Sequence, residues 1–152
     1  MANTMRWRYG DTCPVMLPVL SATVIEIGDL IYLDTDNAKP ASAQADQGTE
    51  AANQELFHDR FAGVAMQQSR SGDTQPIRVA TAGVFEFDCV SGTFEVGKLV
   101  GADENTGGTA LEDQFVTPVN TPNLAIGRCA KRVSPAGTRG LVDIVTPGEK
   151  GG

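Results

Sequence analysis

Apolar residues come in short runs along this chain, and several of the runs alternate with polar residues. Phe85-Glu86-Phe87-Asp88 is a clear case, in which every second side chain is apolar. A period of two places one face of a strand in a core and the other in water. Runs rich in Val, Ile, Phe and Thr therefore predict strands. They cover residues 23–27, 30–33, 76–81, 84–88, 94–96, 124–130 and 141–146.

Two parts of the chain repeat one pattern in the same order. Residues 26–31 read EIGDLI and residues 95–100 read EVGKLV, and in each an Asp follows three residues later. Further on, FAGVA at 61–65 matches LAIGR at 124–128 with a small shift, and IRV at 77–79 matches VDI at 142–144. The matched order predicts a degraded duplication. Gly28 and Gly97 then fall at equivalent turns, where glycine supplies a positive φ.

The predicted fold class is all-β: a small antiparallel β-barrel or sandwich built from two pseudo-repeats, with an extended N-terminal arm and one short helix. The predicted organisation is an arm over 1–22, a β-domain over 23–148 with halves at about 23–83 and 93–148, and a flexible tail over 149–152. We predict loops over residues 38–53 and 101–109. Thr49 can cap a short helix that leans on the barrel through Phe57 and Phe61.

The arm carries a compact aromatic and basic cluster, Arg6-Trp7-Arg8-Tyr9, which includes the only Trp of the chain. Trp, Tyr and Arg are the residue types most enriched at interface hot spots. Two arrangements remain open, because such an arm either folds back onto its own barrel or docks on another chain.

Composition and charge narrow the function classes. Seventeen Gly and eight Pro among 152 residues argue against a helical bundle, and no apolar stretch approaches a membrane span. The net charge is −7; the acidic residues concentrate between 26 and 113, and both ends are basic. An acidic body disfavours binding to phosphate backbones. The basic ends are suited to an acidic partner or a neighbouring subunit.

Motifs that suggest chemistry are incomplete. Residues 92–99 match most of a phosphate loop, but Leu99 stands where a magnesium-binding Ser or Thr is needed. The acidic turns at Asp34 and Asp103 lack the glycine and the glutamate of a calcium loop. Three Cys without paired spacing, and His58 alone, do not make a zinc site or a catalytic pair. We therefore predict no catalytic residue, no cofactor and no metal.

Several of these segments resemble tailed-phage head decoration proteins, also called capsid cement proteins. The resemblance rests on the turn at Gly28 to Ile31, the strand at 61–65 and the run PIRVATAGVF at 76–85. A second Gly-x-Leu-Val turn at 97–100 and a closing VDIV strand at 142–145 follow, so it covers about 23–146.

The resemblance implies a structural protein on the outer capsid surface of a virion, not an enzyme. Such proteins bind major capsid protein, often as trimers, and hold neighbouring subunits together against the pressure of packaged DNA. It implies a homo-oligomer, with a trimer favoured, and neither a nucleic-acid nor a membrane partner. The alternatives are another virion or tail β-barrel adaptor, a receptor-binding module, or a small β-rich enzyme.

The candidate capsid or subunit contacts are Arg6, Trp7, Arg8 and Tyr9 on the arm, and Arg128, Lys131 and Arg132 as a second patch. For this second patch another interpretation stays open, in which the basic residues keep a solvated edge strand from pairing with other chains.

Overall fold

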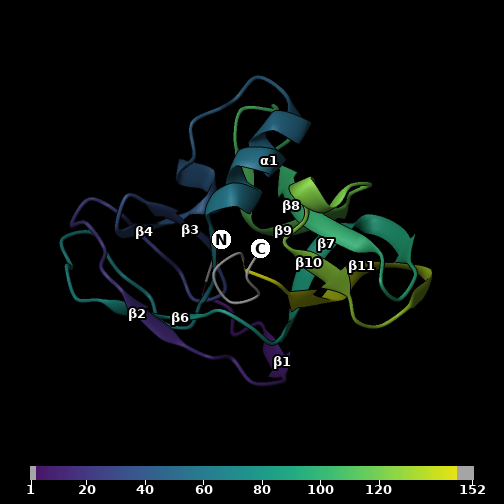
Figure 1. Cartoon of the computed structure of the whole chain (residues 1–152), viewed down its shortest axis with the longest axis horizontal. Coiled ribbons are helices and arrows are strands. Elements are labelled where there is room, and N and C mark those ends of the chain that lie inside the picture. Colours follow the sequence, from purple (N-terminus) through teal and green to yellow (C-terminus); the bar gives the residue numbers. More distant parts are fainter. Residues whose placement is uncertain (1–2, 147–152) are drawn as a thin grey trace.

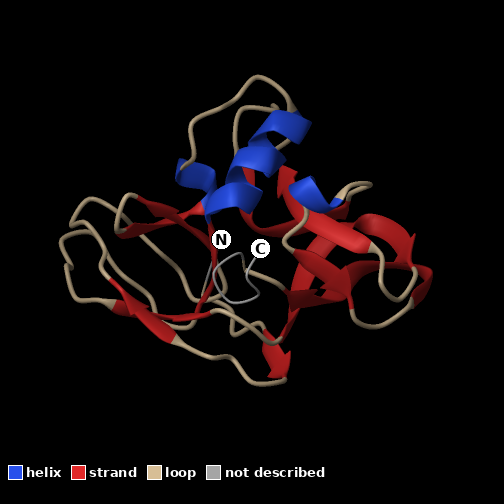
Figure 2. Ribbon diagram, viewed as in Figure 1, coloured by secondary structure: helices blue, strands red, loops and turns tan. Residues whose placement is uncertain are grey.

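The computed structural model describes residues 3–146. Two groups of strands lie side by side, and the α-helix α1 (Glu50–Arg60) lies above the junction between them (Figures 1 and 2). Each group takes its strands from a continuous part of the chain. We call the group formed by β2 to β6, within residues 15–80, the open module, and the group formed by β7 to β11, within residues 84–144, the barrel module.

The barrel module is a closed ring of five strands. They are β7 (Val84–Phe94), β8 (Leu99–Glu104), β9 (Leu111–Pro118), β10 (Gly127–Cys129) and β11 (Val133–Ile144). Their order is β7-β11-β10-β8-β9, with every neighbouring pair antiparallel. A parallel pairing of β9 with β7, at Asp88–Phe115 and Cys89–Val116, closes the ring. Closure removes the free strand edges of the sheet.

The open module has the same strand order without the closing ladder. Its strands are β2 (Val15–Leu17), β3 (Leu30–Asp34), β4 (Asn37–Pro40), β5 (Phe61–Ala65) and β6 (Ile77–Ala80). The order β2-β6-β5-β3-β4 repeats that of the barrel module strand for strand. Near the gap between β2 and β4, the Ala38 amide donates one backbone hydrogen bond to the Pro18 carbonyl (2.9 Å).

The arm strand β1 (Trp7–Tyr9) pairs antiparallel with the start of β7. Trp7 lies opposite Phe85 and Tyr9 opposite Val84, whereas β9 pairs with β7 further along. The predicted class is therefore confirmed: the fold is all-β, with a small barrel, two pseudo-repeats, an N-terminal strand and a short helix.

The two repeat turns have the same backbone geometry. Gly28 and Gly97 have φ of 100° and 88°, as the repeated pattern predicts. Four matching hydrogen bonds hold the turns: Gly28 N to Ala65 O (2.9 Å), Ala65 N to Asp29 O (2.9 Å), Gly97 N to Cys129 O (2.8 Å) and Cys129 N to Lys98 O (2.8 Å). Asp29 and Lys98 are thus equivalent residues in the two modules.

Strand pairing corrects one part of the sequence match. Ala65 lies opposite Val79 and Cys129 opposite Val142, so Val79 is equivalent to Val142 rather than to Ile144. The shift of two residues keeps each side chain on the same face of its strand, which is why the residue pattern alone did not reveal it.

The helix α1 (Glu50–Arg60) begins where the sequence predicts. The Thr49 hydroxyl accepts a hydrogen bond from the Ala52 amide (3.1 Å) and caps the helix. Phe57 is fully buried, and its ring centroid lies 5.5 Å from that of Phe61 and 6.1 Å from that of Tyr32. The helix thus leans on the strands through Phe57, as predicted. Two short 3-10 turns are η1 (Ala41–Ala43) and η2 (Pro122–Leu124).

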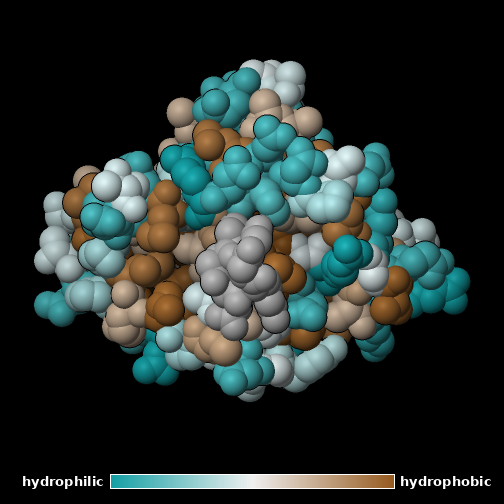
Figure 3. All heavy atoms as spheres, viewed as in Figure 1, coloured by the Kyte–Doolittle hydropathy of each residue, from teal (hydrophilic) through white to brown (hydrophobic). Residues whose placement is uncertain are grey.

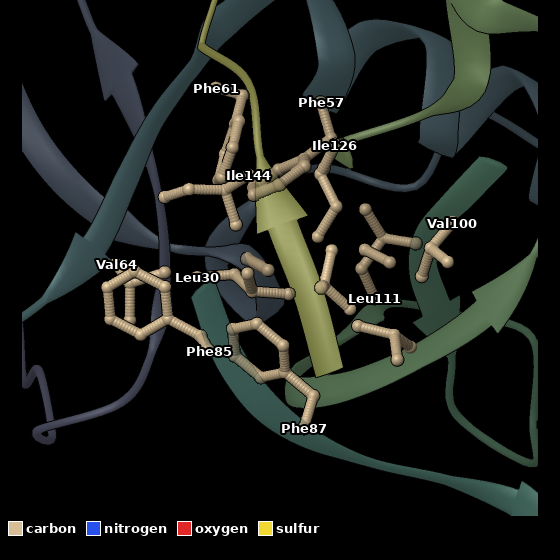
Figure 4. Packing of buried hydrophobic residues seen from close by; sticks show 14 of the residues in the cluster. Leu30, Phe57, Phe61, Val64, Phe85, Phe87, Val100, Leu111, Ile126 and Ile144 are labelled. Carbon is tan, nitrogen blue, oxygen red and sulfur yellow. The ribbon is translucent and has the colours of Figure 1, made fainter. Parts of the chain in front are cut away.

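Both modules contribute to the larger core. Figure 4 shows Leu30, Phe61 and Val64 of the open module converging with Phe85 and Ile144 of the barrel module. A smaller apolar cluster, which includes Ile25 and Ile31, belongs to the open module and its flanking loops. The shared cluster ties the modules into one folding unit, since its burial requires both.

Several predicted elements differ from the structure. Residues 23–27 form a single bridge, Ile25 with Ser69, instead of a strand. The predicted loops at 38–53 and 101–109 contain β4 with η1, and the end of β8. The sequence also misses β9, because three consecutive polar residues interrupt its apolar pattern.

The strand β2 lies within the predicted arm and pairs with β6. The division into 1–22 and 23–148 stays a prediction, and the predicted tail at 149–152 lies outside the described residues.

Candidate interaction surface

Of the side chains from Met5 to Tyr9, only that of Arg6 is buried. Met5, Trp7 and Tyr9 are 48%, 40% and 51% exposed. Arg6 and Arg8, which alternate with them, make ion pairs with acidic residues of β7. Of the two predicted arrangements, the structure has the arm folded onto its own barrel, with the Trp7 ring left partly exposed.

Arg6 is buried and joins the arm to both modules. Its guanidinium donates to the Gln114 side-chain oxygen from Nε (3.0 Å) and Nη2 (2.8 Å) and pairs with Asp88 (3.1 Å). The Gln114 amide in turn donates to Asp29 Oδ1 (2.9 Å) in the open module. Arg6 was predicted as a contact with another chain, and the structure places it inside its own chain, where it anchors the arm.

Asp29 is a buried carboxyl group in this network. Burial raises the pKa of Asp29 to about 6, although hydrogen bonds from the Glu26 amide and the Gln114 side chain act in the opposite direction. The equivalent residue of the barrel module, Lys98, is at the surface and donates to Asn120 (3.2 Å). The turn of the open module is therefore specialised to receive the arm.

The predicted second basic patch divides between two cavities. Lys131 and Arg132 line a groove of about 310 Å³ together with Arg139 of β11. Arg128 lines a different cavity of about 220 Å³ and donates to the Gly97 carbonyl (3.0 Å). The structure thus groups Lys131 and Arg132, separates Arg128 from them, and adds Arg139, which sequence reasoning missed.

Exposed large apolar side chains concentrate in the first 24 residues. Seven of the ten such side chains within residues 3–146 lie there, and we call them the N-terminal apolar surface. Its members are Met5, Trp7, Tyr9, Val15, Met16, Leu20 and Val24. Figure 1 shows β1 and β2, which carry four of them, along the same lower side of the molecule. Contiguous exposed apolar patches mark protein-binding sites, and the concentration of these side chains in one segment makes it a candidate.

An apolar groove adjoins this surface. It has a volume of about 380 Å³, and Val15 and Leu17 of β2, Leu33 of β3 and Phe61 of β5 are among its lining residues. In Figure 3 a group of apolar side chains is visible over the region of β2, β3 and β6. The missing ladder between β2 and β4 leaves this side of the open module accessible.

Sequence reasoning found Trp7 and Tyr9 but missed the rest of the N-terminal apolar surface. Pro14 and Pro18 make the segment between them read as irregular, whereas Val15–Leu17 is a strand. The available signal was the run Val15-Met16-Leu17, whose apolar residues have no polar alternation.

Residues with catalytic potential are held in structural contacts. Burial raises the pKa of the Cys89 and Cys129 thiols, so both are protonated at neutral pH and poorly nucleophilic. The His58 Nδ1 atom donates to the Ala125 carbonyl (2.7 Å) and fastens α1 to η2. Within residues 3–146, no group of three or more His, Cys, Asp and Glu residues is arranged to hold a metal ion. None of the helices in that range is long and apolar enough to cross a membrane.

The described residues thus form two similar β-modules, with exposed apolar side chains concentrated in the first 24 residues. A family model of phage cement proteins matches residues 45–144, and the chain belongs to this family. A search of curated proteins returned no match. Family membership gives the chain a structural, capsid-stabilising role, not an enzymatic one, and places it in the capsid of a virion. The resemblance noted from the sequence is therefore confirmed.

Proposed function

We propose that this protein binds the outer surface of an assembled capsid through its N-terminal apolar surface and bridges neighbouring major capsid protein subunits. The observation that carries the proposal is the concentration of exposed apolar side chains in residues 5–24. Exposed Trp, Tyr and Met side chains lower the solubility of a protein when no partner covers them. A partner surface that covers them removes this effect.

The way the arm is attached supports a mechanical role. Arg6 fixes the base of β1 through buried hydrogen bonds, and Trp7 and Tyr9 stand on either side of the exposed Arg8. A preorganised aromatic pair loses little side-chain entropy on binding. The barrel module, to which β1 is paired, is a closed ring and resists deformation. Force from an expanding shell then acts on the contact surface without unfolding the protein.

The proposal includes self-association, with a trimer favoured. Three linked copies gain avidity, because each bound copy raises the effective concentration of the others at the shell. Contacts that are individually weak then suffice to hold neighbouring subunits against internal DNA pressure. Sedimentation of the free protein over a range of concentrations tests the trimer independently of shell binding.

Binding of arm variants to shells that lack the protein tests the proposed surface. A Trp7→Ala/Tyr9→Ala variant should bind at least about tenfold more weakly, as expected when hot-spot aromatics are truncated. The matched control is Val90→Ala/Val96→Ala, which truncates exposed side chains of the barrel module. Thermal unfolding of each variant verifies that it is folded. Equal loss in both variants, or wild-type binding by the arm variant, would contradict the proposal.

A stability measurement on whole particles tests the cementing role. Particles carrying the wild-type protein should release DNA at a higher temperature than bare particles, and particles incubated with the arm variant should behave as bare ones. Counting copies by mass spectrometry separates a cement, present in hundreds, from a tail adaptor, present in about a dozen or fewer. An unchanged release temperature with full occupancy would contradict cementing while leaving binding intact.

A further inference from the structure

We infer that the groove between β7, the β10–β11 loop and β11 binds an acidic segment of a partner protein, and that the arm makes this groove cationic. Three basic residues, Lys131, Arg132 and Arg139, line the groove, and Glu86 is one of its walls. Val133 and Leu141 contribute apolar surface. The groove is distinct from the N-terminal apolar surface.

Lys131 and Arg132 make few interactions with acidic residues of their own chain. Among the described residues the Lys131 ammonium has no hydrogen-bond or ion-pair partner. Arg132 pairs with Glu95 at 3.1 Å, but their side chains are 63% and 76% exposed, and such pairs exchange readily with water. Each can therefore accept an incoming carboxylate.

Arg139 lies near two carboxylates, and each of these carboxylates makes a shorter ion pair with an arginine of the arm. It lies 3.9 Å from Glu86 and 3.5 Å from Asp88, beyond the usual length of a charged hydrogen bond. Arg8 lies 3.1 Å from Glu86 and Arg6 lies 3.1 Å from Asp88. The arm arginines thus neutralise the β7 carboxylates, and Arg139, which is 66% exposed, keeps its charge available.

The charge balance identifies the chemistry of the occupant. Four exposed basic side chains and the buried Arg6 meet three acidic ones around this groove, in a chain whose net charge is −7. The basic residues are Arg6, Arg8, Lys131, Arg132 and Arg139, and the acidic ones are Glu86, Asp88 and Glu95. A short groove with a carboxylate in its wall, set in an acidic body, suits the separate carboxylates of a peptide. A nucleic acid requires a longer row of cations.

A labelled hexaglutamate peptide is the probe, with full-length protein and fluorescence anisotropy as the readout. A Lys131→Gln/Arg139→Gln variant should bind at least about fivefold more weakly than wild type, since two charge contacts are removed. Arg139→Lys keeps the charge and should retain binding. Arg78→Gln, at an exposed position of β6, is the matched control and should bind like wild type.

The contribution of the arm has its own variant. Arg8→Gln frees Glu86 to pair with Arg139 and should weaken peptide binding, although residue 8 does not line the groove. Wild-type affinity in Arg8→Gln would overturn the role of the arm. Absence of peptide binding by the wild type, equal affinity in the double variant, or tighter binding of a short DNA duplex would overturn the acidic-segment inference. Only the placement of that segment on the shell rests on the proposed function, and peptide binding is measured without shells.

Discussion

The open module and the barrel module share one strand order but differ in closure. In the barrel module the eleven-residue strand β7 reaches β9 and closes the ring, whereas β2, its equivalent, has three residues. The open module is left with an apolar groove beside β2, and its turn at Gly28 receives the arm. One module is thus a closed ring, and the other keeps an open side with an apolar groove.

The largest expected effect tests whether the modules fold together. Phe87→Ala removes a fully buried ring from the shared core and should lower the free energy of unfolding by about 3–5 kcal/mol. Because the cluster includes Leu30 and Val64 of the open module, calorimetry should still show a single transition. Two separate transitions, with the open module unaffected, would contradict a common core.

The equivalent glycines give a matched pair of substitutions. A Cβ atom on Gly28 would collide with the Thr4 carbonyl and lie 2.9 Å from the Arg6 side chain, whereas one on Gly97 meets nothing within 4 Å. Gly97→Ala should cost about 1–2 kcal/mol from backbone strain alone, and Gly28→Ala about 3 kcal/mol because overpacking adds to it. Denaturant unfolding measures both. Equal losses would show that the arm is not seated on Gly28 in solution.

The next effect concerns pH and the equivalent residues Asp29 and Lys98. The pKa of Asp29 is raised to about 6 in the folded state, above its ordinary value of 3.8, so the folded state takes up the proton first. Stability from this group should therefore rise as the pH falls from 7 towards 4, by up to about 3 kcal/mol.

The Asp29→Asn variant should lose this part of the pH dependence. Asp103, whose pKa burial and a hydrogen bond with Glu50 also raise to about 6, provides the control, because Asp103→Asn should leave the Asp29 contribution in place. The measurement is the free energy of unfolding of wild type and both variants between pH 4 and 7. An identical slope in wild type and Asp29→Asn would contradict the burial of an ionisable Asp29.

The smallest effect contrasts an ion pair within the barrel module with one between the arm and that module. Arg132→Gln should change the free energy of unfolding by less than about 0.5 kcal/mol, since both partners of the Arg132–Glu95 pair are exposed. Arg6→Gln breaks a pair whose arginine side chain is 6% exposed and should cost about 2 kcal/mol or more. Thermal unfolding compares the two. A larger loss of unfolding free energy in Arg132→Gln than in Arg6→Gln would contradict the burial of the Arg6–Asp88 pair.

Much of the fold could be predicted from local patterns. The repeated Gly turns at 28 and 97 and the Thr49 cap depend on residues close in sequence, and each is present as predicted. The strand β9 could not be predicted from alternation, because its buried Gln114 is satisfied by Arg6 and Asp29, which are remote in sequence. Closure of one module and not the other also depends on long-range pairing.

The candidate site was predictable only in part, for the same reason. The composition of the arm identified Trp7 and Tyr9 as candidate contacts. It could not reveal that Arg6 turns inward, because the carboxylate and amide that bind it come from β7 and β9. The sequence does not distinguish Arg139 from other surface arginines, because its position opposite Asp88 depends on the pairing of β11 with β7.

A reconstruction of the decorated particle by electron microscopy tests the central claim most directly. We predict that β1 and β2 face the shell, with Trp7 and Tyr9 buried across a boundary between neighbouring subunits of the major capsid protein. Density that places the N-terminal apolar surface towards solvent, or wholly over a single capsid subunit, would contradict it.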